Sequence, residues 1–461
     1  MQYLSTRGGI APISFCDTVL MGLATDGGLL LPASIPDVRA QLPAWRALAY
    51  PDLARALLGR FMDDLPPAEL DGVIARGYAH FRDPAIAPVK RVGPLFIQEL
   101  FHGPTLAFKD LALQPLGELF GVVLGRTGGH LNVLAATSGD TGSAAIHGVR
   151  GRDHLAIVVL HPHQRVSPVQ ERQMTTVLDA NVHNLAIRGN FDDCQDLVKR
   201  LFNDLTFKER YALGAVNSVN LARVLIQVVY YFYGVFRVQE ATGAARVHVC
   251  VPTGNFGNVF AGWLARRMGA PIGDLLLASN ENNILDRFFR TGEYARGAVQ
   301  PTLSPSMDIQ VASNFERYLY YHFGADPRRL ADAMRAFGKG GAIRVPTAGA
   351  GGVDSGIRSG TGDTAATLSA IRRYYEQHGY LLDPHTAVGV AVAEAQRDPA
   401  VPTLCLATAH PAKFGAAVAQ ALGRDVAHHP ELDRLAGLPT RCTVLPNDLA
   451  ALRGFLTATL A

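Results

Sequence analysis

Short apolar runs that lead into a polar, glycine-bearing turn and then into a helical pattern recur along this chain. The strands predicted from these runs cover residues 95–99, 131–135, 155–160, 247–251 and 403–407. Strands that are apolar throughout and alternate with helices are typical of parallel sheets with helices on both faces. The pattern therefore predicts an α/β fold in which ligands bind at the carboxyl ends of the strands.

The first part of the chain differs from this pattern. Residues 1 to about 85 predict an α-rich segment, with a turn and short strand at 26–32 and helices between 43 and 80. A further helix is expected over 109–124. Pro115 lies inside it and should kink the helix or shift its start, because proline has no N–H and crowds the preceding turn.

Residues 338–364 are rich in glycine, serine, threonine and alanine and have no apolar period. This composition predicts a mobile surface segment or a linker. Residues 360–365 match the pattern G-x-G-x-x-A of dinucleotide-binding sites, but the match is weak because such a turn should follow a buried strand.

Composition and charge narrow the range of functions. The chain has 461 residues, 48% of them hydrophobic, which suits a well-buried core in two or three domains. The 43 basic and 40 acidic residues form no block of like charge, so neither nucleic acid nor an anionic membrane is an expected partner. The apolar stretch 221–236 contains Arg223 and has a helical rather than a membrane-spanning pattern.

The cysteines and the N-terminus point to the cytoplasm. Five cysteines lie far apart, without a C-x-x-C pair or a zinc spacing, so we expect a reducing compartment and no metal. Residues 1–7 are not a basic segment followed by an apolar run, so export is not expected.

Lys109 is the first candidate for chemistry. It is the ninth residue of the run Phe-His-Gly-Pro-Thr-Leu-Ala-Phe-Lys-Asp at residues 101–110, behind apolar side chains and without a neighbouring cation. A desolvated lysine loses part of its preference for the ammonium form, and the neutral amine attacks an aldehyde to form a Schiff base. The alternative is a lysine whose stem lies along an apolar surface while its charge remains in water.

Three turns supply further candidate groups. Residues 253–258, Thr-Gly-Asn-Phe-Gly-Asn, could direct backbone N–H groups and a helix terminus at one phosphate; the alternative is a tight turn with left-handed asparagines. Residues 138–143, Ser-Gly-Asp-Thr-Gly-Ser, could bind a carboxylate or could simply cap a helix. Thr408 follows a predicted strand, where its hydroxyl could contact a ligand ring or cap a helix.

An amine for an aldehyde, a cradle for one phosphate and a hydroxyl for a ring nitrogen together indicate a pyridoxal 5'-phosphate (PLP) site. Residues 101–110, 136–142, 254–258 and 407–414 closely resemble the motifs of the threonine synthase family. The resemblance implies the fold-type II architecture of PLP enzymes, similar to the tryptophan synthase β chain, with two parallel-sheet domains after an α-rich N-terminal segment.

The implied division of the chain has three parts. They are the N-terminal segment 1–85, a first α/β domain 86–215 with Lys109 and the Ser-Gly-Asp-Thr-Gly turn, and a second α/β domain 216–461 with the Gly-Asn-Phe-Gly-Asn turn and Thr408. These boundaries are approximate, and the domains are expected to interleave.

The resemblance also implies an activity in threonine biosynthesis. Members of this family are PLP-dependent lyases that release phosphate from Cγ of O-phospho-L-homoserine and add water at Cβ to give L-threonine. By motif, Lys109 would carry the cofactor and Thr408 would face its pyridine nitrogen. The cofactor phosphate would be bound by Gly254, Asn255, Phe256, Gly257 and Asn258. The substrate would contact Ser138, Gly139, Asp140, Thr141, Arg223 and Lys413, the last two through its phosphate.

Several alternatives stay open. Leu221, Asn283 and His147 depart from the family pattern, so a paralogue acting on a related phosphorylated or phosphonate amino acid, or a dehydratase-like lyase, is the second interpretation. A nicotinamide oxidoreductase would depend on residues 360–365 alone. A cofactor-binding protein without turnover is a further alternative, and both a monomer and a homodimer are compatible with the sequence.

Overall fold

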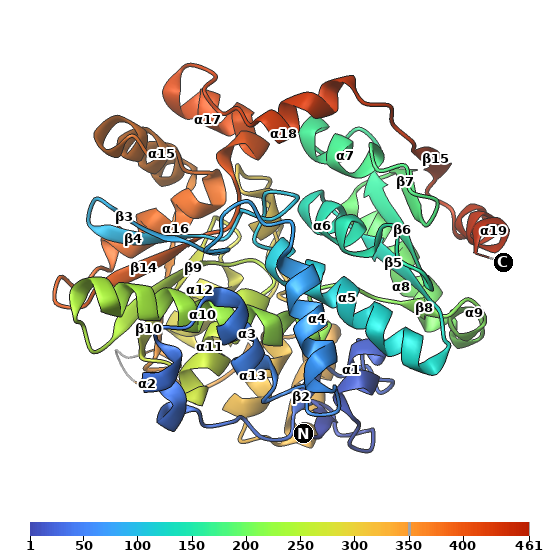
Figure 1. Cartoon of the computed structure of the whole chain (residues 1–461), viewed down its shortest axis with the longest axis horizontal. Coiled ribbons are helices and arrows are strands. Elements are labelled where there is room, and N and C mark those ends of the chain that lie inside the picture. The colour runs from blue at the N-terminus through green and yellow to red at the C-terminus, as the bar shows by residue number, and fades with distance from the viewer. Residues whose placement is uncertain (349–351, 461) are drawn as a thin grey trace.

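Two sheets, each covered by helices, organise the chain (Figure 1). The computed structural model describes residues 1–348 and 352–460. The larger sheet has six strands in the order β13-β10-β9-β14-β4-β3, and all neighbours are parallel except the hairpin pair β3 and β4. Its strands are β3 (Val89–Val92), β4 (Leu95–Glu99), β9 (Val247–Pro252), β10 (Ile272–Ser279), β13 (Ile357–Thr361) and β14 (Thr403–Ala407).

The second sheet has five strands in the order β15-β7-β6-β5-β8, and every neighbouring pair is parallel. It consists of β5 (Leu131–Ala136), β6 (Leu155–Pro162), β7 (Val182–Arg188), β8 (Leu213–Gly214) and β15 (Thr443–Pro446). The predicted α/β class with parallel sheets is confirmed. The five strands expected from apolar runs are all present, two of them with the predicted bounds.

Helices connect and cover these strands. The helices of the second sheet are α6 (Asp140–Val149), α7 (Pro168–Thr175), α8 (Phe191–Asn203), α9 (Leu205–Arg210) and α19 (Leu449–Thr459). The others are α5 (Asp110–Thr127), α10 (Leu221–Thr242), α11 (Gly257–Met268), α12 (Ile284–Thr291), α13 (Phe315–His322), α14 (Pro327–Gly338), α15 (Thr364–His378), α16 (Pro384–Ala395), α17 (Gly415–Leu422) and α18 (Pro430–Asp433). Short 3₁₀ turns include η2 (Pro305–Met307) and η4 (Pro411–Phe414), and β11 (Glu293–Tyr294) pairs with β12 (Ile343–Arg344).

The N-terminal segment is α-rich, as predicted. Its strands β1 (Tyr3–Ser5) and β2 (Leu30–Pro32) form an antiparallel pair. Its helices are α1 (Phe15–Met21), α2 (Leu42–Trp45), α3 (Tyr50–Leu58) and α4 (Pro67–Tyr78). The two sheets interleave along the chain. Strands β3 and β4 of the larger sheet come before β5 of the second sheet, and β15 of the second sheet comes after β14 of the larger one. The three domain ranges given above remain a proposal.

The glycine-rich region is more ordered than predicted. Residues 357–361 form the edge strand β13, which pairs in parallel with β10, and α15 begins at Thr364. The prediction of a mobile segment or linker is therefore wrong for these residues, whereas 349–351 lie outside the described residues. An edge strand is held by backbone hydrogen bonds to its neighbour, so it can form without an apolar period of its own.

Helix α10 forms part of the core. By length and composition it could cross a membrane, but 94% of its most apolar 18-residue window is buried inside the protein. It packs against α11, α3 and α5. The structure thus agrees with the predicted helical rather than membrane-spanning pattern of this stretch.

Helix α5 begins at Asp110 and continues past Pro115, so its start is not shifted, while the alternative effect, a kink at Pro115, stays a prediction. The proline removes the N–H that would bond the carbonyl of Leu111, and the Tyr78 hydroxyl donates to this carbonyl instead, at 3.1 Å. The close approach of α4 requires Gly77, since a Cβ there would lie 2.9 Å from the Cα of Pro115. The neighbouring helix thereby supplies the missing donor.

We expect Tyr78→Phe to destabilise the protein by about 1–2 kcal/mol, because the buried Leu111 carbonyl loses its donor. Tyr320→Phe is the matched control, since the Tyr320 hydroxyl makes no hydrogen bond to any described residue. Urea unfolding followed by circular dichroism should give a lower midpoint for Tyr78→Phe only. Equal midpoints for the two variants would show that the Tyr78 hydroxyl does not replace the missing N–H.

Candidate active site

Lys109 lies immediately before α5, in the loop that follows β4. This loop is bound to the segment after β14: the N–H of Phe108 donates to the carbonyl of Thr408 at 2.8 Å, and the N–H of His410 donates to that of Leu106 at 3.0 Å. Leu106 has a left-handed backbone with φ +61°. Two turns that are 300 residues apart in sequence are thus fixed side by side by main-chain hydrogen bonds.

Asp110 closes the lysine loop from behind. Its buried carboxylate accepts hydrogen bonds from the N–H and the hydroxyl of Thr105, each at 2.8 Å, and from Gln114 at 3.1 Å. A Cβ on Gly103 would lie 2.4 Å from the Cβ of Asp110, so the loop requires glycine there. The aspartate of the 101–110 motif therefore shapes the loop.

The amine of Lys109 faces the buried carboxylate of Asp140 at the start of α6. The Lys109 Nζ lies 3.1 Å from Asp140 Oδ2, and the Nζ of Lys413 lies 2.7 Å from Asp140 Oδ1. The side-chain amide of Gln170 donates to Oδ1 as well, at 2.8 Å. Lys413 also donates to the carbonyl of Thr105 at 2.8 Å. One carboxylate therefore joins two lysines.

Burial and neighbouring charges set the ionisation of Lys109 and Asp140. Burial lowers the pKa of Lys109, with further lowering by the cations of Lys413 and Arg223, while Asp140 opposes the shift. Burial disfavours the charged form of Asp140, yet the ammonium groups of Lys109 and Lys413 hold its pKa well below the usual value. The site thus combines a lysine with an increased fraction of neutral amine and an ionised carboxylate.

Arg223, on the first turn of α10, is a buried cation without a carboxylate partner among the described residues. Its Nη1 donates to the carbonyl of Val216 at 2.8 Å, and its Nε is buried with no hydrogen-bond partner. Burial lowers its pKa to about 10, so the guanidinium remains charged near neutral pH. An anionic ligand would compensate this charge.

The turn before α11 has the features of a phosphate cradle. The N–H groups of Asn255, Gly257 and Asn258 make no hydrogen bond to any described residue, and they lie at the start of a 12-residue helix. A Cβ on Gly254 would lie 2.5 Å from the carbonyl oxygen of Ser306. Free amides at a helix N-terminus attract anions.

Phe256 gives this turn its shape. It is the left-handed residue of the turn, with φ +64°, so the alternative of left-handed asparagines is wrong. Its ring centroid lies 5.2 Å from that of Phe315 and 5.8 Å from that of Tyr318. Aromatic packing therefore offsets the cost of a backbone conformation that non-glycine residues seldom adopt.

Asn258 is oriented by two tyrosines. Its side-chain oxygen accepts hydrogen bonds from the hydroxyls of Tyr230 at 2.6 Å and Tyr231 at 2.7 Å. Its side-chain nitrogen is buried and has no hydrogen-bond partner within the described part of the chain. A buried amide with an unused N–H calls for an explanation, and a bound ligand would supply the acceptor.

Thr408 is connected through Asp383 to Ser306, whose carbonyl lies beside Gly254 of the cradle; sequence reasoning missed this role of Asp383. The Asp383 carboxylate accepts from the hydroxyl of Thr386 and, at 2.9 Å, from Nδ1 of His385. The Thr386 hydroxyl accepts the N–H of Thr408 at 3.2 Å, and Nε2 of His385 accepts the N–H of Ser306 at 3.2 Å. The hydroxyl of Thr408 itself makes no hydrogen bond to a described residue.

The turn after β5 uses the hydroxyls at its two ends and leaves those of Ser138 and Thr141 unbonded within the described residues. Thr137 accepts the N–H groups of Gly139 at 3.0 Å and Gly142 at 2.8 Å, so the capping role considered for residues 138–143 falls to Thr137. Gly139 has φ +138°. Ser138 is exposed, and neither its hydroxyl nor that of Thr141 bonds to a described residue.

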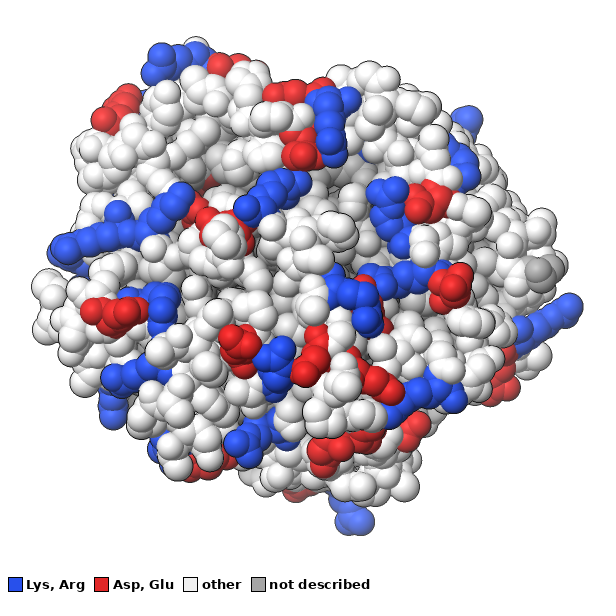
Figure 2. All heavy atoms as spheres, viewed as in Figure 1, with Lys and Arg blue, Asp and Glu red and all other residues white. Residues whose placement is uncertain are grey.

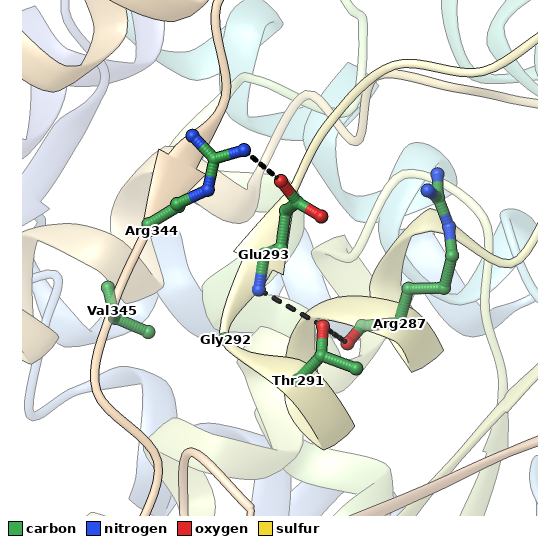
Figure 3. Close-up of a pocket in the computed structure, with 6 residues that line it drawn as sticks. All are labelled: Arg287, Thr291, Gly292, Glu293, Arg344 and Val345. Carbon is green, nitrogen blue, oxygen red and sulfur yellow. Dashed lines mark hydrogen bonds and ion pairs between the residues drawn. The ribbon is translucent and has the colours of Figure 1, made fainter.

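These turns follow β4, β5, β9 and β14, so the candidate groups gather at carboxyl ends of strands from both sheets. Another pocket, of about 390 Å³, lies at α12, β11 and β12 and contains none of these groups (Figure 3). The guanidinium of Arg344, which lines this pocket, is paired with the carboxylate of Glu293. The chemistry therefore belongs to the site around Lys109.

The residues of this site fit PLP. Lys109 offers an amine of lowered pKa, the turn before α11 offers free amides for a phosphate, and Thr408 offers a free hydroxyl for a ring nitrogen. The buried side-chain nitrogen of Asn258 is a further unused donor.

Comparisons with known proteins agree with this arrangement. The family models "Threonine synthase N terminus" and "Threonine synthase, C-terminal" match residues 2–78 and 386–456, and the model "Pyridoxal-phosphate dependent enzyme" matches residues 84–355. The threonine synthase of Pseudomonas aeruginosa is 44% identical over 99% of this chain and 98% of its own length.

Two solved structures have the same architecture. PLP-bound threonine synthase from Brucella melitensis has a TM-score of 0.94 and 42% identity, covering 100% of this chain and 99% of that one. Threonine synthase from yeast has a TM-score of 0.94 and 39% identity, covering 100% and 98% of the two chains. The expected fold-type II architecture is confirmed, and this chain belongs to the threonine synthase family of PLP-dependent enzymes.

Proposed function

We propose that this chain converts O-phospho-L-homoserine and water into L-threonine and phosphate, with PLP carried by Lys109. The observation that carries the proposal is a buried lysine of lowered pKa that lies near the cation of Arg223. Amides at the start of α11 without a partner among the described residues support it. Such a site suits a cofactor with one phosphate and a substrate with another.

Bound PLP supplies an electron sink for the negative charge that develops when the Cα proton leaves. Lys109 would hold the cofactor through its amine. When not bonded to the cofactor, this amine would be the base that takes the Cα proton and moves protons at Cβ and Cγ. Asp140 accepts a hydrogen bond from this amine and fixes its position.

The remaining residues hold the anionic parts of cofactor and substrate. The N–H groups of Asn255, Gly257 and Asn258 bind the cofactor phosphate, helped by the conformation of Gly254 and Phe256, and Thr408 binds the ring nitrogen. The hydroxyls of Ser138 and Thr141, with the main-chain N–H of Asp140, bind the substrate carboxylate, whereas the N–H of Gly139 already donates to Thr137. Arg223 binds the substrate phosphate. Lys413 was predicted to share this task, but its amine already contacts Asp140 and Thr105.

The cellular setting is part of the proposal. The described residues contain five free cysteines, which suits the reducing cytoplasm. Figure 2 shows both signs of charge interspersed over the viewed face, which favours a small-molecule substrate over a polyanion. Both a monomer and a homodimer remain compatible with the chain.

The oxidoreductase alternative loses support. At the Gly-x-Gly-x-x-Ala match, the N–H of Gly362 donates to the carbonyl of Ser279 at 2.8 Å. The N–H of Thr364, at the start of α15, donates to the carboxylate of Glu281 at 2.7 Å. A helix start that already holds a carboxylate does not offer its amides to a pyrophosphate.

The purified protein with PLP should release phosphate and threonine from O-phospho-L-homoserine in equal amounts. Lys109→Ala should lower the rate by about 10³-fold or more, because both the cofactor anchor and the base are lost. Lys199→Ala, at an exposed lysine of α8, is the control and should retain full rate. Phosphate with a 2-oxo acid instead of threonine would favour a dehydratase-like lyase, and no product would favour a paralogue.

Arg223→Met should raise KM for O-phospho-L-homoserine by about 10- to 100-fold, since a charge-assisted hydrogen bond is worth about 1.5–3 kcal/mol. Inhibition by inorganic phosphate should weaken in parallel. The control is Arg237→Met on the same helix, which removes a partly exposed arginine paired with Glu240. Unchanged KM and unchanged phosphate inhibition in Arg223→Met would assign Arg223 to the fold rather than to the substrate.

A further inference from the structure

Asp140 shares its two oxygens between two lysines that are held in different ways. The side chain of Lys413 is completely buried and its Nζ bonds to both Asp140 and the Thr105 carbonyl. The side chain of Lys109 is 11% exposed, and its Nζ makes no other hydrogen bond among the described residues. Lys413 is therefore a fixed partner, whereas Lys109 can leave and return.

This difference matters because the charge of Lys109 changes in the proposed function. If Lys109 were the sole counterion of Asp140, each loss of the ammonium charge would leave a buried carboxylate unpaired. Leaving one member of a buried ion pair without its partner is strongly unfavourable, so Asp140 would take up a proton. The permanent contact with Lys413 removes this penalty, and Asp140 stays ionised whether Lys109 is charged or neutral.

We propose that Asp140 and Lys413 form a fixed ion pair whose task is to position the amine of Lys109 and to set its proton affinity. In this pair Asp140 attracts the proton of Lys109, and Lys413 limits that attraction. The inference rests on the proposed function for the role of Lys109. Lys413 therefore acts on Lys109 rather than on the substrate phosphate, and the Asp140 side chain acts on Lys109 rather than on the substrate.

The other charged groups around Lys109 and its partners come from four elements. Asp140 lies at the start of α6, Lys413 in η4 and Arg223 on α10. Burial raises the pKa of Asp110, on α5, while hydrogen bonds from Thr105 and the cation of Lys413 oppose this shift. Gln170 of α7 is neutral and bonds to Asp140. Removing Asp140 or Lys413 therefore changes the local charge by one unit in opposite directions.

The test is the pH dependence of Lys109 reactivity, measured in the cofactor-free full-length chain. A small acylating reagent is applied across a pH series, and the modified peptide is quantified by mass spectrometry. Asp140→Asn should shift the midpoint for Lys109 downward by about 1 pH unit or more, because an opposite charge raises a lysine pKa by this order. Lys413→Met should shift it upward, and the double variant should fall between the two.

A second readout uses the holoenzyme without substrate. The pH midpoint of the visible absorbance of the PLP-loaded protein should move in the same two directions. Shifts in one common direction, or no shifts, would overturn the inference, because loss of structure alone does not produce opposite signs. If either single variant fails to fold, the test uses two other variants: the double variant, which lacks both charges, and Lys413→Arg, which keeps the positive charge. Both should then have midpoints closer to wild type than the single variant that folds.

The two proposals fail in different ways. Absence of visible absorbance in the wild-type protein with PLP would contradict the proposed function. The labelling experiment would still measure Lys109 directly and would decide on Asp140 and Lys413 by itself.

Discussion

The carboxylate of Asp140 is the contact on which the geometry of the site depends. It belongs to α6, which follows β5 of the five-stranded sheet, while Lys109 and Lys413 follow β4 and β14 of the six-stranded sheet. A carboxylate buried in this way is tolerated only when opposite charges and hydrogen-bond donors surround it. The ion pairs of Asp140 with Lys109 and Lys413 therefore hold elements of the two sheets together at the point where the reactive amine lies.

The turns that carry the site contain local strain that packing offsets. Leu106 and Phe256 have left-handed backbones, and each such residue costs about 1–2 kcal/mol. The Leu106 turn is fixed by main-chain bonds to the segment after β14, and the Phe256 turn by aromatic rings. Strained turns of this kind leave N–H groups without partners in the turn before α11 and place the amine of Lys109 in the site. Strain, burial and unused donors therefore occur at the same place.

Much of this arrangement could be predicted from the sequence. The strands were recognisable because buried parallel strands are apolar throughout, and the motifs at Lys109 and at residues 254–258 are long and local. The hydrogen bonds from Asp383 through Thr386 to Thr408 and through His385 to Ser306 could not be found from pattern, because these contacts exist only after folding. The edge strand β13 was missed because its pairing with β10, not its composition, makes it a strand. The compensation at Pro115 could not be found from pattern because Tyr78, on another helix, replaces the missing donor.

In the proposed active site Lys109 carries PLP, and Lys413, the other lysine on the same carboxylate, does not. Borohydride reduction of the PLP-loaded protein fixes the cofactor to the amine that holds it, and peptide mass spectrometry then locates the added mass. We predict a single modified lysine, Lys109, with Lys413 unmodified because its amine is buried and bonded to Asp140 and Thr105. Cofactor on Lys413, or on surface lysines without preference, would contradict the assignment of the active site.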